Sequence, residues 1–294
     1  MMWIFDDAAT ASLMDRQLLF DYLAQHNIAA EGYFHEALQD DEGWAWRYPA
    51  YAVKCFASDQ TLEQKLQLLC SKRGGGKNEQ LEQKLRQKVT LFSRVNRAEN
   101  QEVEQHQQIE QNDIERNYQN VLVEFHALYA LTALMGYQFV GWDQPSGKQG
   151  VNPAKNCDLA LTRDGKIVFA DAKDCSSEIL TQCEIEHDVN GETVSVTHFD
   201  PKLELVRWLT DQVREVDEKG ADLLVCHLPG WGLEGFGPQE LKRYLDEILP
   251  SVLTWTDYGP HWQISSSWVK QIIIVKRIGC FVIELDGINA TQHQ

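Results

Sequence analysis

The stretch NCDLALTRDGKIVFADAKDC, from Asn156 to Cys175, decides the fold of this chain. Two mainly apolar segments flank the dipeptide Asp164-Gly165, and this arrangement predicts a strand, a tight turn and a second strand. Both predicted strands contain charged residues, at Asp158, Asp171 and Lys173. A buried charge in an apolar strand is costly unless another group balances it. The three charged residues are therefore candidates for a functional site.

The period of two in a strand places these charges on one surface. Asp171 and Lys173 share a face of the second strand, and Asp158 lies on the face opposite Cys157 in the first strand. If the two strands pair, Asp158 converges with Asp171 and Lys173. Two close carboxylates repel each other, and a divalent cation such as Mg²⁺ with its preference for oxygen ligands would relieve this. Lys173 beside it could orient or help deprotonate a water, or offset charge on a phosphate.

A third carboxylate interrupts the apolar stripe of a predicted helix at 121–135. Glu124 occupies a stripe position that should face a core. An unpaired carboxylate there would cost about 2–5 kcal/mol. A metal site or a basic partner would remove this cost, and so would a turn toward solvent or an ion pair with Lys173.

The segments around this stretch alternate between strand and helix patterns. Strands are predicted at 137–142, 221–228, 271–277 and 280–285, a second hairpin at 183–199 around Asn190-Gly191, and helices at 201–219 and 238–249. Together they predict an α/β fold with a mixed central sheet flanked by helices.

The first part of the chain has a different character. Residues 1 to about 60 read as helices joined by turns, and the aromatic cluster at 43–51 is either a stacking platform for bases or a plug over a helical core. Segment 62–97 carries nine Lys or Arg and three Glu, a net charge of +6, and either touches a nucleic-acid backbone or forms a solvated helix face. A Gln- and Glu-rich stretch follows. We therefore expect a helical recognition or regulatory domain at 1–113 and a second domain at 114–294.

Composition limits the class of protein. The net charge of -17 argues against a protein that coats nucleic acid or an anionic membrane by bulk charge, although it is compatible with carboxylates that hold a metal. Seven cysteines without a CxxC pair favour reduced thiols in the cytoplasm. The N-terminus lacks the pattern of a secretory signal, and no apolar segment is long enough to span a bilayer, so we expect no membrane partner.

The order of these features resembles the PD-(D/E)xK nuclease superfamily, whose members have the restriction-endonuclease-like fold. A helix with Glu124, a strand with Asp158, and an Asp-x-Lys strand with Asp171 and Lys173 carry the resemblance, which covers about 120–285. One departure is Cys157, where the family pattern has a proline before the first Asp.

This resemblance implies a set of roles. Asp158 and Asp171 would ligate Mg²⁺, with Mn²⁺ as a substitute, while Glu124 and the main-chain carbonyl of Ala172 would complete the metal shell. Lys173 would help activate water.

Other polar residues could approach such a site. The resemblance also implies that polar residues of the helix at 201–219 approach the metal site, and Lys202 and Glu204 are the candidates. In the glycine-rich loop before Asp158, Lys148 and Lys155 are either phosphate contacts or ordinary exposed lysines.

The expected function is that of a Mg²⁺-dependent phosphodiesterase, a DNA endonuclease in preference to an RNase, in a setting of defence against phage or other foreign DNA. A homodimer and a protein partner for the N-terminal domain are further expectations. The alternative is a catalytically inactive nuclease-fold protein that acts as a binding or scaffold subunit.

Overall fold

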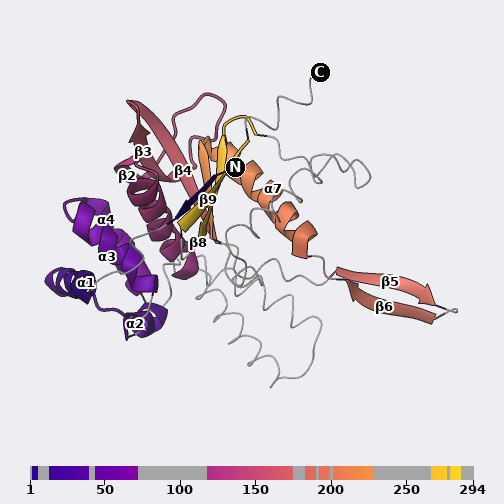
Figure 1. Ribbon diagram of the computed structural model, residues 1–294, viewed down its shortest axis with the longest axis horizontal. Coiled ribbons are helices and arrows are strands. Elements are labelled where there is room, and N and C mark those ends of the chain that lie inside the picture. Colours follow the sequence, from indigo (N-terminus) through magenta and orange to yellow (C-terminus); the bar gives the residue numbers. More distant parts are fainter. Residues whose placement is uncertain are drawn as a thin grey trace. The chain divides into compact units, whose positions relative to one another are not determined.

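The computed structural model divides the chain into two compact units. It describes residues 2–5, 13–39, 44–71, 118–174, 183–189, 192–198, 201–227, 266–276 and 279–285 (Figure 1). Met1–Phe5 and Asp143–Gln294 form the sheet unit, and Asp6–Trp142 forms the helical unit. The predicted domain boundary near residue 113 lies outside the described residues, and the helix at 118–129 belongs to the helical unit.

A mixed sheet is the centre of the sheet unit, as predicted. Six of its strands follow the order β1-β9-β8-β7-β4-β3, and a seventh, β2, lies next to β3. The boundary between the two units in the sequence falls within β2. Strands β4, β7 and β8 are parallel, and the β3–β4, β8–β9 and β1–β9 pairs are antiparallel. The bounds are β1 Met2–Phe5, β2 Gln138–Gln144, β3 Cys157–Arg163, β4 Lys166–Asp174, β7 Leu223–His227, β8 Gln271–Lys276 and β9 Gly279–Glu284.

Strand β1 corrects the expectation that the chain begins with helices. Met2 pairs with Val282 and Phe5 with Gly279. Four apolar residues at the start of the chain therefore form an edge strand beside β9, which lies near the end of the chain. Four residues are too few to show the alternating pattern that identifies a strand, and the partner strand lies at the other end of the sequence. The local sequence therefore carries no signal for β1.

The β3–β4 hairpin confirms the predicted strand, turn and strand. Asp164 and Gly165 have φ of +52° and +73°, as a two-residue hairpin turn requires. The ladder runs from Arg163 opposite Lys166 to Leu159 opposite Ala170. This register fixes which residues of the two strands lie side by side.

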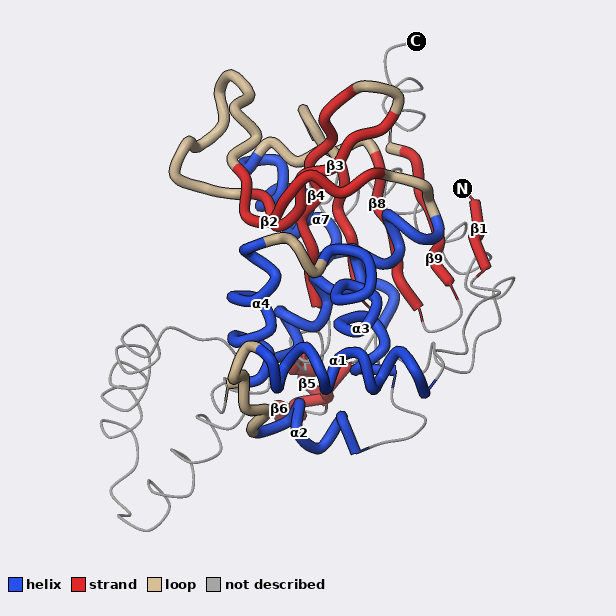
Figure 2. The backbone as a smooth tube through the Cα atoms, turned by 90° about the vertical axis from the view of Figure 1, so that its left-hand side faces the viewer, coloured by secondary structure: helices blue, strands red, loops and turns tan. Residues whose placement is uncertain are grey.

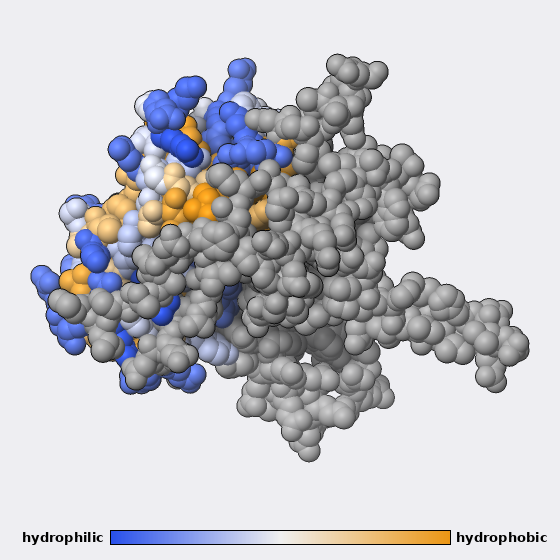
Figure 3. Space-filling model, viewed as in Figure 1, coloured by the Kyte–Doolittle hydropathy of each residue, from blue (hydrophilic) through white to orange (hydrophobic). Residues whose placement is uncertain are grey.

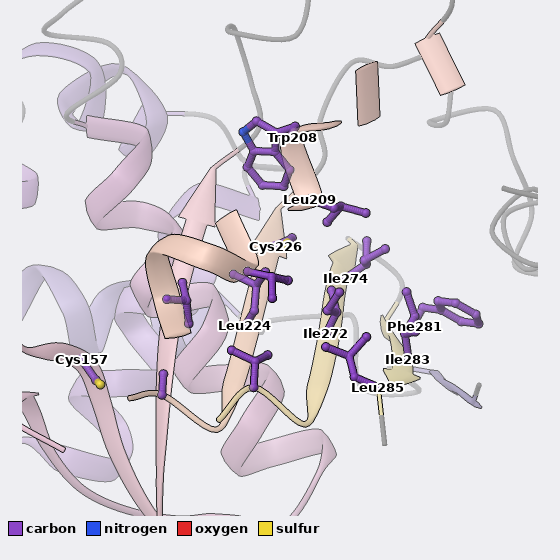
Figure 4. Close-up of a cluster of buried hydrophobic side chains, with 14 residues drawn as sticks. Cys157, Trp208, Leu209, Leu224, Cys226, Ile272, Ile274, Phe281, Ile283 and Leu285 are labelled. Carbon is purple, nitrogen blue, oxygen red and sulfur yellow. The ribbon is translucent and has the colours of Figure 1, made fainter. Parts of the chain in front are cut away.

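Helix α7, Pro201–Lys219, has the bounds that the sequence predicted and packs on the buried strands. The shared core contains Cys157, Trp208, Leu209, Val213, Val216, Ala221, Leu224, Cys226, Val269, Ile272, Ile274, Phe281, Ile283 and Leu285 (Figure 4). All five residues of β7 are buried, as is typical of a strand covered on both faces.

Gly220 ends α7 with a left-handed φ of +72°. Its N–H donates to the carbonyl of Asp217, and the N–H of Ala221 donates to that of Val216, which closes the helix in a Schellman-type cap. A Cβ at Gly220 would lie 2.6 Å from Oγ of Ser146. The end of α7 therefore requires glycine for both conformation and space.

The second predicted hairpin forms a separate two-stranded sheet. It consists of β5, Cys183–Val189, and β6, Glu192–His198. Val189 pairs with Glu192, so two residues join the strands, as the Asn190-Gly191 pattern predicts. Those two residues, and the helix predicted at 238–249, lie outside the described residues.

The helical unit consists of packed helices (Figure 2): α1 Leu13–Gln25, α2 Gly32–Gln39, α3 Trp44–Phe56, α4 Gln60–Cys70, and the helix at 118–129, which continues into the π-helical turn η1, Ala130–Leu134. Trp46 and Tyr48 are buried in its core, and Tyr48 stacks on His126 with ring centroids 4.0 Å apart. Trp46 and Tyr48 therefore belong to a helical core, as the plug interpretation predicts, and they are not available for stacking with bases.

On the face shown in Figure 3, the described surface has both hydrophilic and apolar areas. Within the described ranges, the large apolar side chains left exposed are Leu18, Leu68, Val140 and Ile167. None of the helices described is both long and apolar enough to cross a membrane.

Candidate active site

Strands β3 and β4 bring two aspartates together. One step beyond the Leu159–Ala170 pair, the antiparallel register places Asp158 opposite Asp171. The N–H of Ala172 donates to Oδ2 of Asp158 at 2.8 Å, and Asp171 is completely buried. The convergence of the carboxylates is thus built into the hairpin.

Burial, followed by the negative charge of Asp171, raises the pKa of Asp158 to about 6. Lys219, the N–H of Ala172 and Lys173 act in the opposite direction and only partly offset these effects. Burial and the neighbouring carboxylate therefore favour the protonated form of Asp158.

Two lysines contact the carboxylate of Asp171. Nζ of Lys219 is 2.6 Å from Oδ2, and Nζ of Lys173 is 3.3 Å from Oδ1. Oδ1 is buried and accepts no hydrogen bond from the described residues. One oxygen of Asp171 is thus engaged and the other lacks a hydrogen-bond donor.

Lys173 has a second carboxylate partner in Glu215, with Nζ to Oε1 at 2.6 Å. Burial opposes the charge on Lys173, but the carboxylates of Asp171 and Glu215 outweigh it and raise the pKa of this lysine. Burial likewise opposes the charge on Glu215, but its hydrogen bond from Lys173 outweighs this and lowers the pKa of Glu215. We call Asp158, Asp171, Lys173, Glu215 and Lys219 the Asp171 cluster.

Helix α7 supplies Glu215 and Lys219, which the sequence analysis missed. The two residues are four apart and therefore lie on the same helix face, next to the apolar stripe of Val213 and Val216. This charged pair beside a core stripe was the signal available in the sequence. The predicted candidates from the same helix, Lys202 and Glu204, have side chains outside the described residues.

Lys148 and Lys155 both have acidic partners near the end of α7. Nζ of Lys148 is 2.7 Å from Oδ1 of Asp222, and Nζ of Lys155 is 2.7 Å from Oε2 of Glu218. These contacts tie the glycine-rich loop to the last turn of α7 and the residues after it. Phosphate binding by either lysine stays a prediction.

Glu124 lies in the helical unit and forms an ion pair with Lys65 of α4. Lys65 is only 6% exposed, and its Nζ lies 5.4 Å from the ring centroid of Trp142. Of the alternatives for Glu124, the structure shows a basic partner, which is Lys65 of the segment 62–97. The predicted place of Glu124 in a metal shell stays a prediction.

The residues of the cluster suit a divalent cation. Asp158 and Asp171 offer hard oxygen ligands, and Oδ1 of Asp171 is a buried acceptor without a hydrogen bond. Across the described ranges, no group of three or more His, Cys, Asp or Glu residues is arranged to hold a metal ion. A cation here would therefore depend on the two aspartates, supplemented by main-chain oxygen such as the carbonyl of Ala172 and by water.

No protein-family model matches the chain, and no curated protein or solved structure is significantly similar to it.

Proposed function

We propose that the chain is a Mg²⁺-dependent phosphodiesterase of the PD-(D/E)xK type with a restriction-endonuclease-like fold, and that it cleaves DNA. The observation that carries the proposal is the adjacency of Asp158 and Asp171, with Lys173 two residues further along the same strand face. The mixed sheet with α7 packed on the strands of these residues supports it.

In this proposal the aspartates hold the cation and Lys173 acts through its positive charge. A bound Mg²⁺ supplies Lewis-acid polarisation of the scissile phosphate. Lys173 lies between Asp171 and Glu215, and these carboxylates keep it protonated. A protonated lysine stabilises charge that develops on the phosphate and cannot accept a proton from water. We therefore favour an electrostatic role for Lys173 over that of a general base.

The wider setting is also part of the proposal. A DNA substrate, a homodimer, a protein partner of the N-terminal domain, a cytoplasmic location and a role in defence rest on analogy with the fold. The free thiols of Cys55, Cys70, Cys157, Cys226 and Cys280 are compatible with a reducing compartment. Lys65 is buried and paired, so in the basic segment it is not an available phosphate contact.

The direct test is cleavage of plasmid DNA, linear DNA and RNA with Mg²⁺ or Mn²⁺. Asp171→Asn and Lys173→Met should lower the rate by about 100-fold or more, because the first removes a ligand charge that holds the cation and the second removes a positive charge that stabilises the reacting phosphate. Lys166→Met, at an exposed position at the start of β4, is the matched control and should cleave like the wild type. Equal cleavage by the wild type, Asp171→Asn and Lys173→Met would overturn the proposal.

A second candidate is a nuclease-fold binding subunit without turnover. The observation in its favour is that Asp171 already has two ammonium groups beside it, so its charge is balanced without a metal. Calorimetry with Mn²⁺ separates the two candidates. Absence of binding, together with a stable complex with a second protein, would favour the binding subunit.

A further inference from the structure

Lys219 occupies a position that the Asp-x-Lys pattern does not account for. Its Nζ lies 2.6 Å from Oδ2 of Asp171, closer than the 3.3 Å that separates Nζ of Lys173 from Oδ1. Asp171 has no exposed surface, whereas the side chain of Lys219 is 15% exposed. The site thus contains a second lysine bonded to the carboxylate of Asp171. This lysine belongs to α7 and has limited contact with solvent.

The main chain of Lys219 is held firmly. Its carbonyl accepts hydrogen bonds from Oγ of Ser146 at 2.8 Å and from Sγ of Cys157 at 3.5 Å. Gly220 follows in the left-handed conformation that ends the helix. The backbone is therefore anchored, while the ammonium lies at the end of a flexible four-carbon chain and can move without disturbing the fold.

The two lysines differ in how they are retained. Lys173 is bonded to Glu215 at 2.6 Å in addition to its contact with Asp171. For the ammonium of Lys219, Asp171 is the ion-pair partner found in the described part of the chain. A cation that approaches Asp171 therefore displaces Lys219 more easily than Lys173.

We propose that Lys219 is an internal cation on Oδ2 of Asp171 and that a divalent cation, for which Oδ1 is the available oxygen, must displace it in order to bind. The inference rests on the proposed metal site. Mg²⁺ requires its oxygen ligands at 2.0–2.1 Å. An ammonium hydrogen-bonded to Asp171 would then lie within a few ångströms of the metal, where two positive charges repel strongly. Lys219 thereby sets the metal concentration at which the site fills.

Calorimetric titration with Mn²⁺ tests the competition. Lys219→Met removes the competing charge and should lower the Kd for Mn²⁺ by roughly tenfold, because a close like charge is lost from a buried site. Lys219→Arg retains a cation that can bond Asp171 with two N–H groups, so its Kd should equal or exceed that of the wild type. Lys166→Met removes an exposed lysine from β4, the strand that contains Asp171, and should leave the Kd for Mn²⁺ unchanged.

Thermal unfolding with EDTA or with Mn²⁺ separates competition from a purely structural role. Lys219→Met should lower the Tm in EDTA, because the ion pair with Asp171 is lost. Saturating Mn²⁺ should restore the Tm to that of the metal-bound wild type, since the pair is absent there as well. An equal loss of Tm with and without Mn²⁺ would overturn the inference.

The possible failures are distinguishable. An equal or higher Kd for Lys219→Met would overturn the role of Lys219 and leave the proposed function intact. No Mn²⁺ binding by either the wild type or Lys219→Met would overturn both. Should Lys219→Met not fold, Lys219→Gln, which keeps a hydrogen-bond donor for Asp171 without the charge, should show the same lower Kd, and an unchanged Kd would overturn the inference.

Discussion

Asp158→Asn should stabilise the metal-free protein, and the gain should grow with pH. Asparagine has nearly the same shape, and its carbonyl oxygen can still accept the hydrogen bond from the N–H of Ala172. The substitution therefore removes a charge and leaves the hairpin geometry in place. What it eliminates is the cost of an ionised carboxylate opposite Asp171.

The magnitude follows from the pKa of Asp158, which rises from 3.8 to about 6. The folded state holds this proton more tightly than the unfolded state, so the free energy of unfolding falls as the pH rises from about 4 through about 6. Each pKa unit corresponds to about 1.4 kcal/mol, so ionised Asp158 costs the fold ~3 kcal/mol at high pH. About half of this, ~1.4 kcal/mol, develops between pH 5 and pH 8.

Urea-induced unfolding in EDTA at several pH values measures this difference. The free energy of unfolding of Asp158→Asn minus that of the wild type should increase by ~1.4 kcal/mol between pH 5 and pH 8. Asp164→Asn, at an exposed turn position of the same hairpin, controls for charge removal elsewhere. A difference that is constant with pH, or that decreases as the pH rises, would refute the reasoning.

Two further substitutions test the packing around the site. Gly220→Ala should destabilise the fold by about 2–4 kcal/mol in urea unfolding, because the left-handed φ and a Cβ 2.6 Å from Oγ of Ser146 are both unfavourable, whereas Gly165→Ala, with a similar φ and nothing within 4 Å, should cost only about 1 kcal/mol. Equal losses would contradict this account. Lys65→Met should cost about 2–4 kcal/mol by leaving the half-buried Glu124 without this cation, and Lys65→Met combined with Glu124→Leu should recover most of the loss. A double variant no more stable than Lys65→Met would show that the ion pair is not the cause.

Local patterns made much of the sheet unit predictable. Asp164-Gly165 between alternating segments specifies the hairpin, and the period of two then brings Asp158 and Asp171 to one surface. The bounds of α7 follow from a long helical pattern that begins at a proline and ends at a glycine. In each case the information lies within a few residues of the feature.

The remainder depends on partners far away in the sequence. Nothing near Glu124 indicates Lys65, which is 59 residues away, and nothing near Asp171 indicates Lys219, which is 48 residues away. The pairing of β1 with β9 spans nearly the whole chain. Helical spacing shows which residues share a face of α7, but only the packing of α7 on the strands shows that Glu215 and Lys219 reach the site.

The charges of the Asp171 cluster link its stability to its proposed chemistry. When every member is ionised, three carboxylates face two ammonium groups, which leaves one excess negative charge. A proton on Asp158 can remove this excess at low pH, as the raised pKa indicates. A divalent cation that displaces Lys219 would replace one positive charge by two and bring the cluster to neutrality. The charge that destabilises the metal-free fold is therefore the one that a metal would balance, and the stability gained by Asp158→Asn should come with the loss of metal binding.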